Sequence, residues 1–255
     1  MSIRDWRWWK WAAGYFPIRV VKTTNLKADG QNYLLVCHPH GLMSLSIGLT
    51  FGTESVNISR RLFPGFRCYV LTLWSMYVIP FIREWWHAMG GRPASDDAMT
   101  ELFSNSTNTM AALVVGGARD IIVEQSDQFR TVVRRRQGFC RIALKTGTHL
   151  VPVISFGEDQ TFTNDTFLRP MITRLMDNGL TLFAPAMISG RWFTVIPHQV
   201  PITMVIGAPV RVPRIDNPTP KDIDHLNGRY CEALSKLYDD HKSAYGYGSR
   251  PLVLL

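Results

Sequence analysis

Short apolar runs alternate along the chain with stretches in which apolar residues recur at helical spacing. Five of these runs have the length and continuous apolarity of strands that are covered on both faces. They comprise residues 33–37, 68–73, 112–115, 150–156 and 202–206. This pattern predicts a sheet that is buried by elements packed on its faces.

Capping signals indicate three helices among these strands. One helix begins at Ser95, a second covers 139–145 and ends at Gly147, and the last runs from Thr219 to near Gly246. Strands alternating with helices, with no linker-like segment between them, predict a single α/β domain. We expect a mostly parallel or mixed central sheet flanked by helices.

The N-terminus combines tryptophan with basic residues. Four of the eight tryptophans lie close together, at Trp6, Trp8, Trp9 and Trp11. Tryptophan favours the boundary between water and lipid, so a helix here would serve as an interfacial anchor or would pack on its own domain. The charges within the segment exclude a signal peptide, and no apolar run reaches the ~18 residues of a spanning helix.

Composition excludes several classes of protein. The chain has 255 residues, a formal net charge of +8 and 46% apolar residues, whereas a disordered chain combines low hydrophobicity with high charge. The four cysteines contain no CxxC pair, which argues against a zinc ribbon and a disulfide framework, and favours a reducing compartment. We expect no metal and no cofactor.

Six basic residues and no acidic residue lie within positions 130–145. They are Arg130, Arg134, Arg135, Arg136, Arg141 and Lys145. A solvated basic face, a nucleic acid, an anionic small molecule and a membrane surface are all compatible with this stretch. Because the cluster precedes a helix that starts near Gly138, it best suits phosphate groups, such as those of coenzyme A.

The turn after the first predicted strand carries the main candidates for catalysis. His38-Pro39-His40-Gly41 follows the apolar run 33–37 directly, and α/β sheets place active sites at the carboxyl ends of strands. Histidine is suited to general-base catalysis because its charge changes near neutral pH. Spacing alone leaves three interpretations open: a general base, a structural histidine and a pair of metal ligands.

Motifs along nearly the whole chain occur in a recognisable order, although the sequence contains no GxSxG, P-loop or GxGxxG pattern. They include Tyr15-Phe16-Pro17, His38-Pro39-His40-Gly41, Phe63-Pro64-Gly65, Val115-Gly116-Gly117-Ala118, Arg136-x-Gly138-Phe139-x-Arg141 and Ser155-Phe156-Gly157-Glu158. Over roughly residues 12–246 the ordered set resembles the type-2 diacylglycerol acyltransferase family, a branch of the glycerolipid acyltransferase superfamily. On this basis residues 1–14 are a membrane-interface segment, 15–246 the acyltransferase domain and 247–255 a C-terminal tail.

The resemblance implies a glycerolipid-acyltransferase-like fold and an acyl-CoA-dependent O-acyltransferase. The enzyme would esterify diacylglycerol to triacylglycerol at the cytosolic face of the endoplasmic reticulum and at lipid droplets, as a peripheral or monotopic protein. The acceptor could instead be a monoacylglycerol, a fatty alcohol or a sterol. A catalytically inactive lipid-binding protein of the membrane is a further alternative, and a nucleic acid is not an expected partner.

Mechanistic roles follow from the resemblance and from the chemistry of acyl transfer. His40 is the first choice for the base and His38 the second, with Asp120, Glu54 or Glu158 orienting the imidazole. The candidate donors to the oxyanion are Gly41, Gly116 and Gly117. The candidate ligands of the coenzyme A phosphates are Arg134, Arg135, Arg136, Gly138 and Arg141, of which Arg136 and Arg141 match the family motif.

The chain departs from the wider pattern at three places. The superfamily places an Asp five positions after its catalytic His, where this sequence has Met43 or Leu45. The family usually has Glu where this chain has Asp120, which is one methylene shorter. Many members also carry a membrane hairpin before the Tyr-Phe-Pro motif, and we expect the tryptophan cluster to replace it here.

Overall fold

A mixed sheet of seven strands forms the centre of the computed structural model, which describes residues 2–41, 43–116, 127–164, 174, 188–191 and 196–255. The strand order is β1-β10-β7-β2-β5-β3-β4. These strands are β1 (Arg19–Lys22), β2 (Tyr33–His38), β3 (Arg67–Thr72), β4 (Gly91–Pro93), β5 (Thr109–Val114), β7 (His149–Phe156) and β10 (Thr203–Ile206). Strands β7, β2, β5, β3 and β4 are parallel, whereas β10 runs antiparallel to β7 and pairs in parallel with β1.

Two strand pairs lie outside the main sheet. β6 (Phe129–Thr131) pairs in parallel with β11 (Leu252–Leu254), so the end of the chain returns to the body of the fold. β8 (Thr163–Asn164) pairs antiparallel with β9 (Ile188–Ser189).

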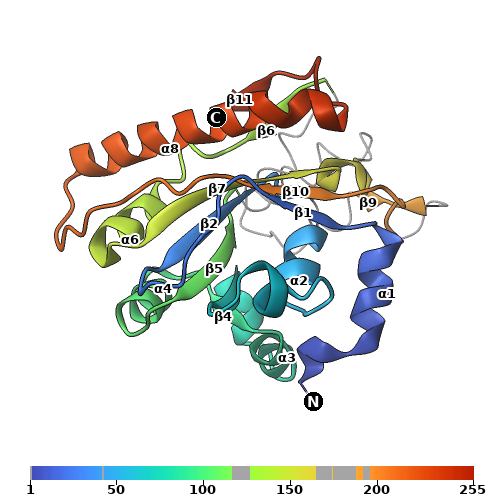
Figure 1. Cartoon of the computed structure of the whole chain (residues 1–255), viewed down its shortest axis with the longest axis horizontal. Helices are drawn as coiled ribbons and strands as arrows, with labels where there is room; N and C mark the ends of the chain where they lie inside the picture. Colours follow the sequence, from blue (N-terminus) through green and yellow to red (C-terminus); the bar gives the residue numbers. More distant parts are fainter. Residues whose placement is uncertain (1, 42, 117–126, 165–173, 175–187, 192–195) are drawn as a thin grey trace.

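Helices cover both faces of the sheet (Figure 1). The α-helices are α1 (Arg7–Tyr15), α2 (Leu45–Phe51), α3 (Ile82–Ala88), α4 (Asp96–Ser104), α6 (Gly138–Thr146) and α8 (Pro220–His241). Short helical segments are η1 (Ile3–Asp5), η2 (Ile58–Leu62), η3 (Trp74–Tyr77), η4 (Glu158–Gln160) and η7 (Lys242–Tyr245). Within the described residues, no helix combines the length and apolarity needed to cross a bilayer.

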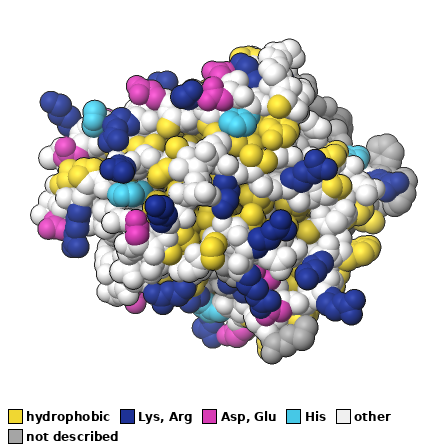
Figure 2. All heavy atoms as spheres, in the orientation of Figure 1, with side chains coloured by type: hydrophobic (Ala, Val, Ile, Leu, Met, Phe, Trp, Pro, Cys, Tyr) yellow, Lys and Arg dark blue, Asp and Glu magenta, His cyan; other side chains and the backbone are white. Residues whose placement is uncertain are grey.

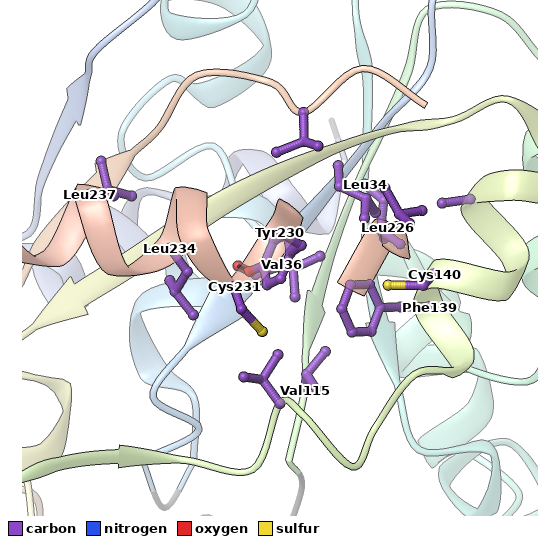
Figure 3. Packing of buried hydrophobic residues seen from close by; sticks show 14 of the residues in the cluster. Leu34, Val36, Val115, Phe139, Cys140, Leu226, Tyr230, Cys231, Leu234 and Leu237 are labelled. Carbon is purple, nitrogen blue, oxygen red and sulfur yellow. Dashed lines mark hydrogen bonds between the residues drawn. The ribbon is translucent and has the colours of Figure 1, made fainter. Parts of the chain in front are cut away.

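The two faces of the sheet have separate apolar cores. On one face, α4, α6 and α8 pack against alternate side chains of β2, β5 and β7. Figure 3 shows Tyr230 and Leu234 of α8 pointing toward this core, with Val36 of β2 and Phe139 of α6 beside them. On the other face, Ile47 and Phe51 of α2 meet the opposite side chains of the same strands.

The mixed α/β fold is confirmed, and all five predicted strands occur, with ends displaced by at most three residues. The three helices also occur as expected. Ser95 accepts the N–H of Ala98, and Gly147 follows α6 with a left-handed φ of 69°. Thr219 forms a reciprocal capping box with Asp222 at the start of α8. The sequence reasoning did not predict α2, α3 or the short strands β1, β4, β6 and β11, which lack long apolar runs.

Candidate active site

Three loops carrying candidate catalytic residues converge at one edge of the sheet. Strands β5, β2 and β7 are parallel neighbours, so their carboxyl ends lie side by side. The His-Pro-His-Gly turn follows β2, Val115-Gly116 follows β5, and Gly157-Glu158 follows β7. Parallel pairing therefore collects residues that are far apart in sequence into one site.

His38 is fully buried, and both of its ring nitrogens are hydrogen-bonded. Nδ1 lies 2.8 Å from Oγ1 of Thr131, and Nε2 lies 2.9 Å from the hydroxyl of Tyr230. The Tyr230 hydroxyl in turn donates to the carbonyl oxygen of Val36 at 3.1 Å. Burial lowers the pKa of His38 to about 3, so the ring is neutral. With both nitrogens engaged, His38 has no free lone pair for a substrate proton.

His40 has a different arrangement two residues later. Its Nδ1 lies 2.7 Å from the carbonyl oxygen of Gly41, an acceptor only, so Nδ1 carries the hydrogen and Nε2 carries the lone pair. Burial lowers the pKa of His40 below its usual value, against the opposing effect of the bond to Gly41. The neutral imidazole with an available Nε2 is the form that a general base requires.

Glu158 supports this turn from the neighbouring strand. Its two carboxylate oxygens accept the backbone N–H groups of Leu45 at 2.7 Å and Ser46 at 2.9 Å, at the beginning of α2. The side chain is buried, and burial raises its pKa, while the donors on Ser46 and Leu45 act in the opposite direction. Glu158 thus supplies the N-terminal cap that Ser44 does not provide.

Gly41 fits closely between the turn and Glu158. Its φ is 54°, and a Cβ added there would lie 2.7 Å from Cγ of Glu158. A side chain at position 41 would therefore clash with Glu158, and the positive φ also favours glycine.

The structure describes only some of the other residues predicted to orient the imidazole or to bind the oxyanion. Asp120 and Gly117 lie outside the described residues. Gly116, two residues after β5, has a φ of 106°. Glu54 lies 3.9 Å from a guanidinium nitrogen of Arg4, and its backbone N–H donates to the carbonyl oxygen of Arg4. The described contacts of Glu54 therefore tie it to the N-terminal segment.

The basic cluster begins close to this site. Thr131, which contacts His38, precedes Arg134 by three residues, so their Cα atoms are at most ~11 Å apart. Arg134, Arg135, Arg136 and Gly138 are exposed before and at the start of α6. Arg141 is also exposed, but it forms an ion pair with Asp96 of α4. The first three arginines form no ion pair among the described residues, so their charge is available to an anion, whereas that of Arg141 is partly compensated.

Figure 2 shows that basic side chains are spread over the whole face in that view, not gathered in one patch. The net charge of +8 is thus distributed more widely than the sequence window 130–145 indicates. Among the described residues, no group of three or more His, Cys, Asp or Glu side chains could hold a metal ion. All four cysteines are free and buried.

Thr131 and Tyr230 were missed as parts of the site by sequence reasoning. Both come from elements outside the central sheet, β6 and α8, and neither belongs to a motif that carries chemistry. A buried histidine needs partners for both nitrogens, but only the tertiary fold shows which hydroxyls supply them.

Known proteins resemble this chain along nearly its whole length. The family model described as "Diacylglycerol acyltransferase" matches residues 1–254. Diacylglycerol O-acyltransferase 2 of Rattus norvegicus is 36% identical over 96% of this chain and 65% of its own length. The Bos taurus protein of that name is 35% identical, and the match covers 70% of its length. Diacylglycerol O-acyltransferase 2-like protein 6 of Homo sapiens is 34% identical, and the match covers 76% of its length.

Among solved structures, the 1-acyl-sn-glycerophosphate (LPA) acyltransferase PlsC from Thermotoga maritima aligns with a TM-score of 0.49 and 14% identity, over 91% of this chain and 76% of its own.

The chain is a mixed α/β protein whose His-Pro-His-Gly turn lies at the carboxyl ends of the parallel strands. By the family model and these relatives, the chain belongs to the diacylglycerol acyltransferase family. It spans 65% of the length of the rat relative.

Proposed function

We propose that the protein is an acyl-CoA-dependent O-acyltransferase that esterifies diacylglycerol to triacylglycerol at a membrane surface. The observation that carries the proposal is the state of His40. Its Nδ1 is committed to the carbonyl oxygen of Gly41, which leaves the Nε2 lone pair for a substrate proton. Membership of a family whose relatives are named diacylglycerol O-acyltransferase 2 supports the substrate class.

In the proposed reaction, Nε2 of His40 takes the proton of the acceptor hydroxyl as its oxygen attacks the thioester carbonyl. A carbon–oxygen bond forms and the carbonyl oxygen becomes an oxyanion. When this intermediate collapses, the carbon–sulfur bond breaks and the coenzyme A thiolate takes the proton back from the imidazolium. The thioester is already activated, so no acyl-enzyme is required.

Backbone N–H groups of Gly41, Gly116 and Gly117 are the proposed donors to the oxyanion. The charge of Asp120 is proposed to stabilise the imidazolium, while Nδ1 of His40 keeps its bond to the carbonyl oxygen of Gly41. Arg134, Arg135 and Arg136 are the proposed ligands of the coenzyme A phosphates, because their exposed side chains follow Thr131, which contacts the site through His38. Arg141 would join them only when it leaves Asp96.

The proposed location is the cytosolic face of the endoplasmic reticulum and the surface of lipid droplets. Acyl acceptors of this class partition into lipid, so the enzyme must approach them from the interface. The tryptophans of the N-terminal segment support this location, because Trp6, Trp8 and Trp11 are 42%, 54% and 70% exposed, whereas Trp9 is partly buried.

The test is ester formation from labelled oleoyl-CoA by the membrane-bound chain, with diacylglycerol, monoacylglycerol, fatty alcohol and sterol offered as acceptors. We expect His40→Ala to lower the rate by ~10²–10⁴, the usual contribution of a general base. His225→Ala, which removes an exposed histidine of α8, is the matched control and should keep full activity.

Transfer to another acceptor would change the proposed substrate but not the class of reaction. No ester with any acceptor would reject the enzyme and favour a lipid-binding protein. Full activity of the His40→Ala variant would reject His40 as the base.

A further inference from the structure

The exposed apolar side chains are concentrated in two segments of the described chain. Thirteen large hydrophobic residues of the described ranges are exposed, and ten of them lie within residues 6–11 and 73–85. The second segment contains the apolar run 76–82, which includes Pro80 and is too short to span a bilayer. Single exposed apolar residues are ordinary, but a contiguous group marks a surface that contacts another partner.

The two segments form one surface. The ring of Trp85 lies 6.5 Å from that of Trp6 and 6.2 Å from that of Trp9. Trp9 in turn neighbours Trp8, and Trp8 stacks on Trp11 at 6.2 Å. Figure 1 shows the N-terminus and α3 side by side. We call this continuous row of rings, together with the exposed residues of 73–85, the aromatic surface.

Residues 73–85 present their apolar side chains outward. Trp74 is 60% exposed and Val78 64%. Phe81 is 87% exposed and has a φ of 66°, a conformation that is rare for a bulky residue. The N–H of Trp85 donates to the carbonyl oxygen of Phe81 at 3.0 Å, so the beginning of α3 holds this backbone. This backbone conformation is unfavourable for phenylalanine, and the side chain lies away from the core. Both features indicate that Phe81 contacts another molecule and does not stabilise the fold.

Charge around the aromatic surface favours one kind of partner. Its acidic residues are paired: Asp5 with Arg60, and Glu84 with Arg83. Arg7 and Lys10 are exposed on α1 and have no ion-pair partner among the described residues. Exposed tryptophan and phenylalanine beside uncompensated positive charge match the interface of a bilayer that contains anionic phospholipid.

We propose that residues 73–85 are a second membrane-docking element, which inserts Trp74 and Phe81 into a phospholipid bilayer beside the tryptophans of α1. The aromatic surface adjoins the elements of the candidate active site. Trp9 of α1 and Leu45 of α2 pack against the same buried cluster, and the His-Pro-His-Gly turn leads into α2. If the proposed function holds, two docking elements would keep the mouth of the site against the lipid that supplies the acceptor.

The experiment measures flotation of the full chain with vesicles of phosphatidylcholine, with and without phosphatidylserine, in the absence of acyl-CoA and acceptor. The test variant combines Trp74→Ser with Phe81→Asn, since asparagine tolerates positive φ. We expect binding to weaken by about tenfold or more, because two rings lose their burial in lipid. The control variant combines Val21→Ser with Ile196→Ser, two exposed apolar residues outside both segments, and should bind as the unchanged chain does.

Stronger binding to the vesicles that contain phosphatidylserine would support the role of Arg7 and Lys10. Unchanged binding of the test variant, with an unchanged thermal transition, would overturn the proposal. Self-association of the unchanged chain without vesicle binding, abolished in the test variant, would also overturn it and assign the surface to a second copy. The His40→Ala variant should bind vesicles normally, so loss of activity in that variant does not affect this result.

Discussion

The two histidines of the His-Pro-His-Gly turn differ in what surrounds their ring nitrogens. His38 contacts hydroxyls on both sides, from Thr131 and Tyr230, and serves as a buried link between β2, β6 and α8. His40 has one nitrogen bonded to the backbone of its own turn. Two residues of one type and one motif therefore differ in the hydrogen bonds that each can still make.

The state of His40 leads to a prediction about pH. A base must be unprotonated, and burial lowers the pKa of His40 below 6.5. The rate should therefore be constant through neutral pH and fall only as pH drops through this lowered pKa. In a profile of kcat/KM, the acidic limb should inflect below pH 6.5. An inflection at or above 6.5 would contradict the assignment, and one near 3, the pKa of His38, would point to that histidine instead.

At the scale of elements, the beginning of α2 depends on a residue from a distant loop, in η4 after β7. Ser44 has left-handed backbone angles and does not cap the helix with its side chain. Glu158, the first residue of η4 after β7, accepts the first N–H groups in its place. The contact joins the loops after β2 and β7, so the geometry of the His40 turn is set from two strands at once.

Replacing Glu158 should therefore reduce catalysis as well as stability. In Glu158→Gln, one acceptor oxygen becomes an NH₂ group that faces a backbone donor. We expect the free energy of unfolding to fall by ~1–3 kcal/mol, because a buried donor loses its partner. We also expect a larger effect on kcat than on the KM for acyl-CoA, because the turn that carries His40 shifts.

Urea unfolding and steady-state kinetics of this variant would be compared with those of Glu101→Gln, an exposed glutamate of α4 that should show neither effect. A Glu158→Gln variant that keeps the normal kcat would show that this carboxylate does not position the turn.

At the scale of the whole molecule, the last residues of the chain brace the site. The hydroxyl of Tyr247 donates to Asp159 and accepts the N–H of Gly157 at 3.0 Å. Arg250 forms a partly buried ion pair with Asp159 at 2.7 Å. These contacts hold the loop that carries Glu158, while β11 pairs with β6 and so supports the strand of Thr131. Residues 247–255 are thus part of the packed fold.

Removing one hydroxyl tests this bracing. In Tyr247→Phe, Asp159 and the N–H of Gly157 lose a buried partner, so we expect ~1–3 kcal/mol of destabilisation and a lower kcat. Tyr245→Phe is the matched control, because this ring stacks on Phe156 and its hydroxyl has no described hydrogen bond. Calorimetry and kinetics should separate the two variants. Equal behaviour of both would contradict a positioning role for the C-terminal residues.

Much of the fold was predictable because it depends on local patterns. The five central strands are continuous apolar runs, and α4, α6 and α8 carry their own caps. Helix α2 was not predictable, since its cap comes from Glu158, more than a hundred positions away. The strands β6 and β11 were missed for a related reason, because each is too short to be recognised without the partner that the fold brings to it.

The sequence by itself determined the class of fold, the family resemblance and the turn that holds the candidate base, because apolar periodicity, caps and short motifs are properties of neighbouring residues. Only the tertiary structure decided which histidine keeps a free nitrogen, which carboxylate supports the turn, and how residues 73–85 join the N-terminal tryptophans into one surface. These features depend on contacts between segments that are distant in the chain, and neither spacing nor composition records them.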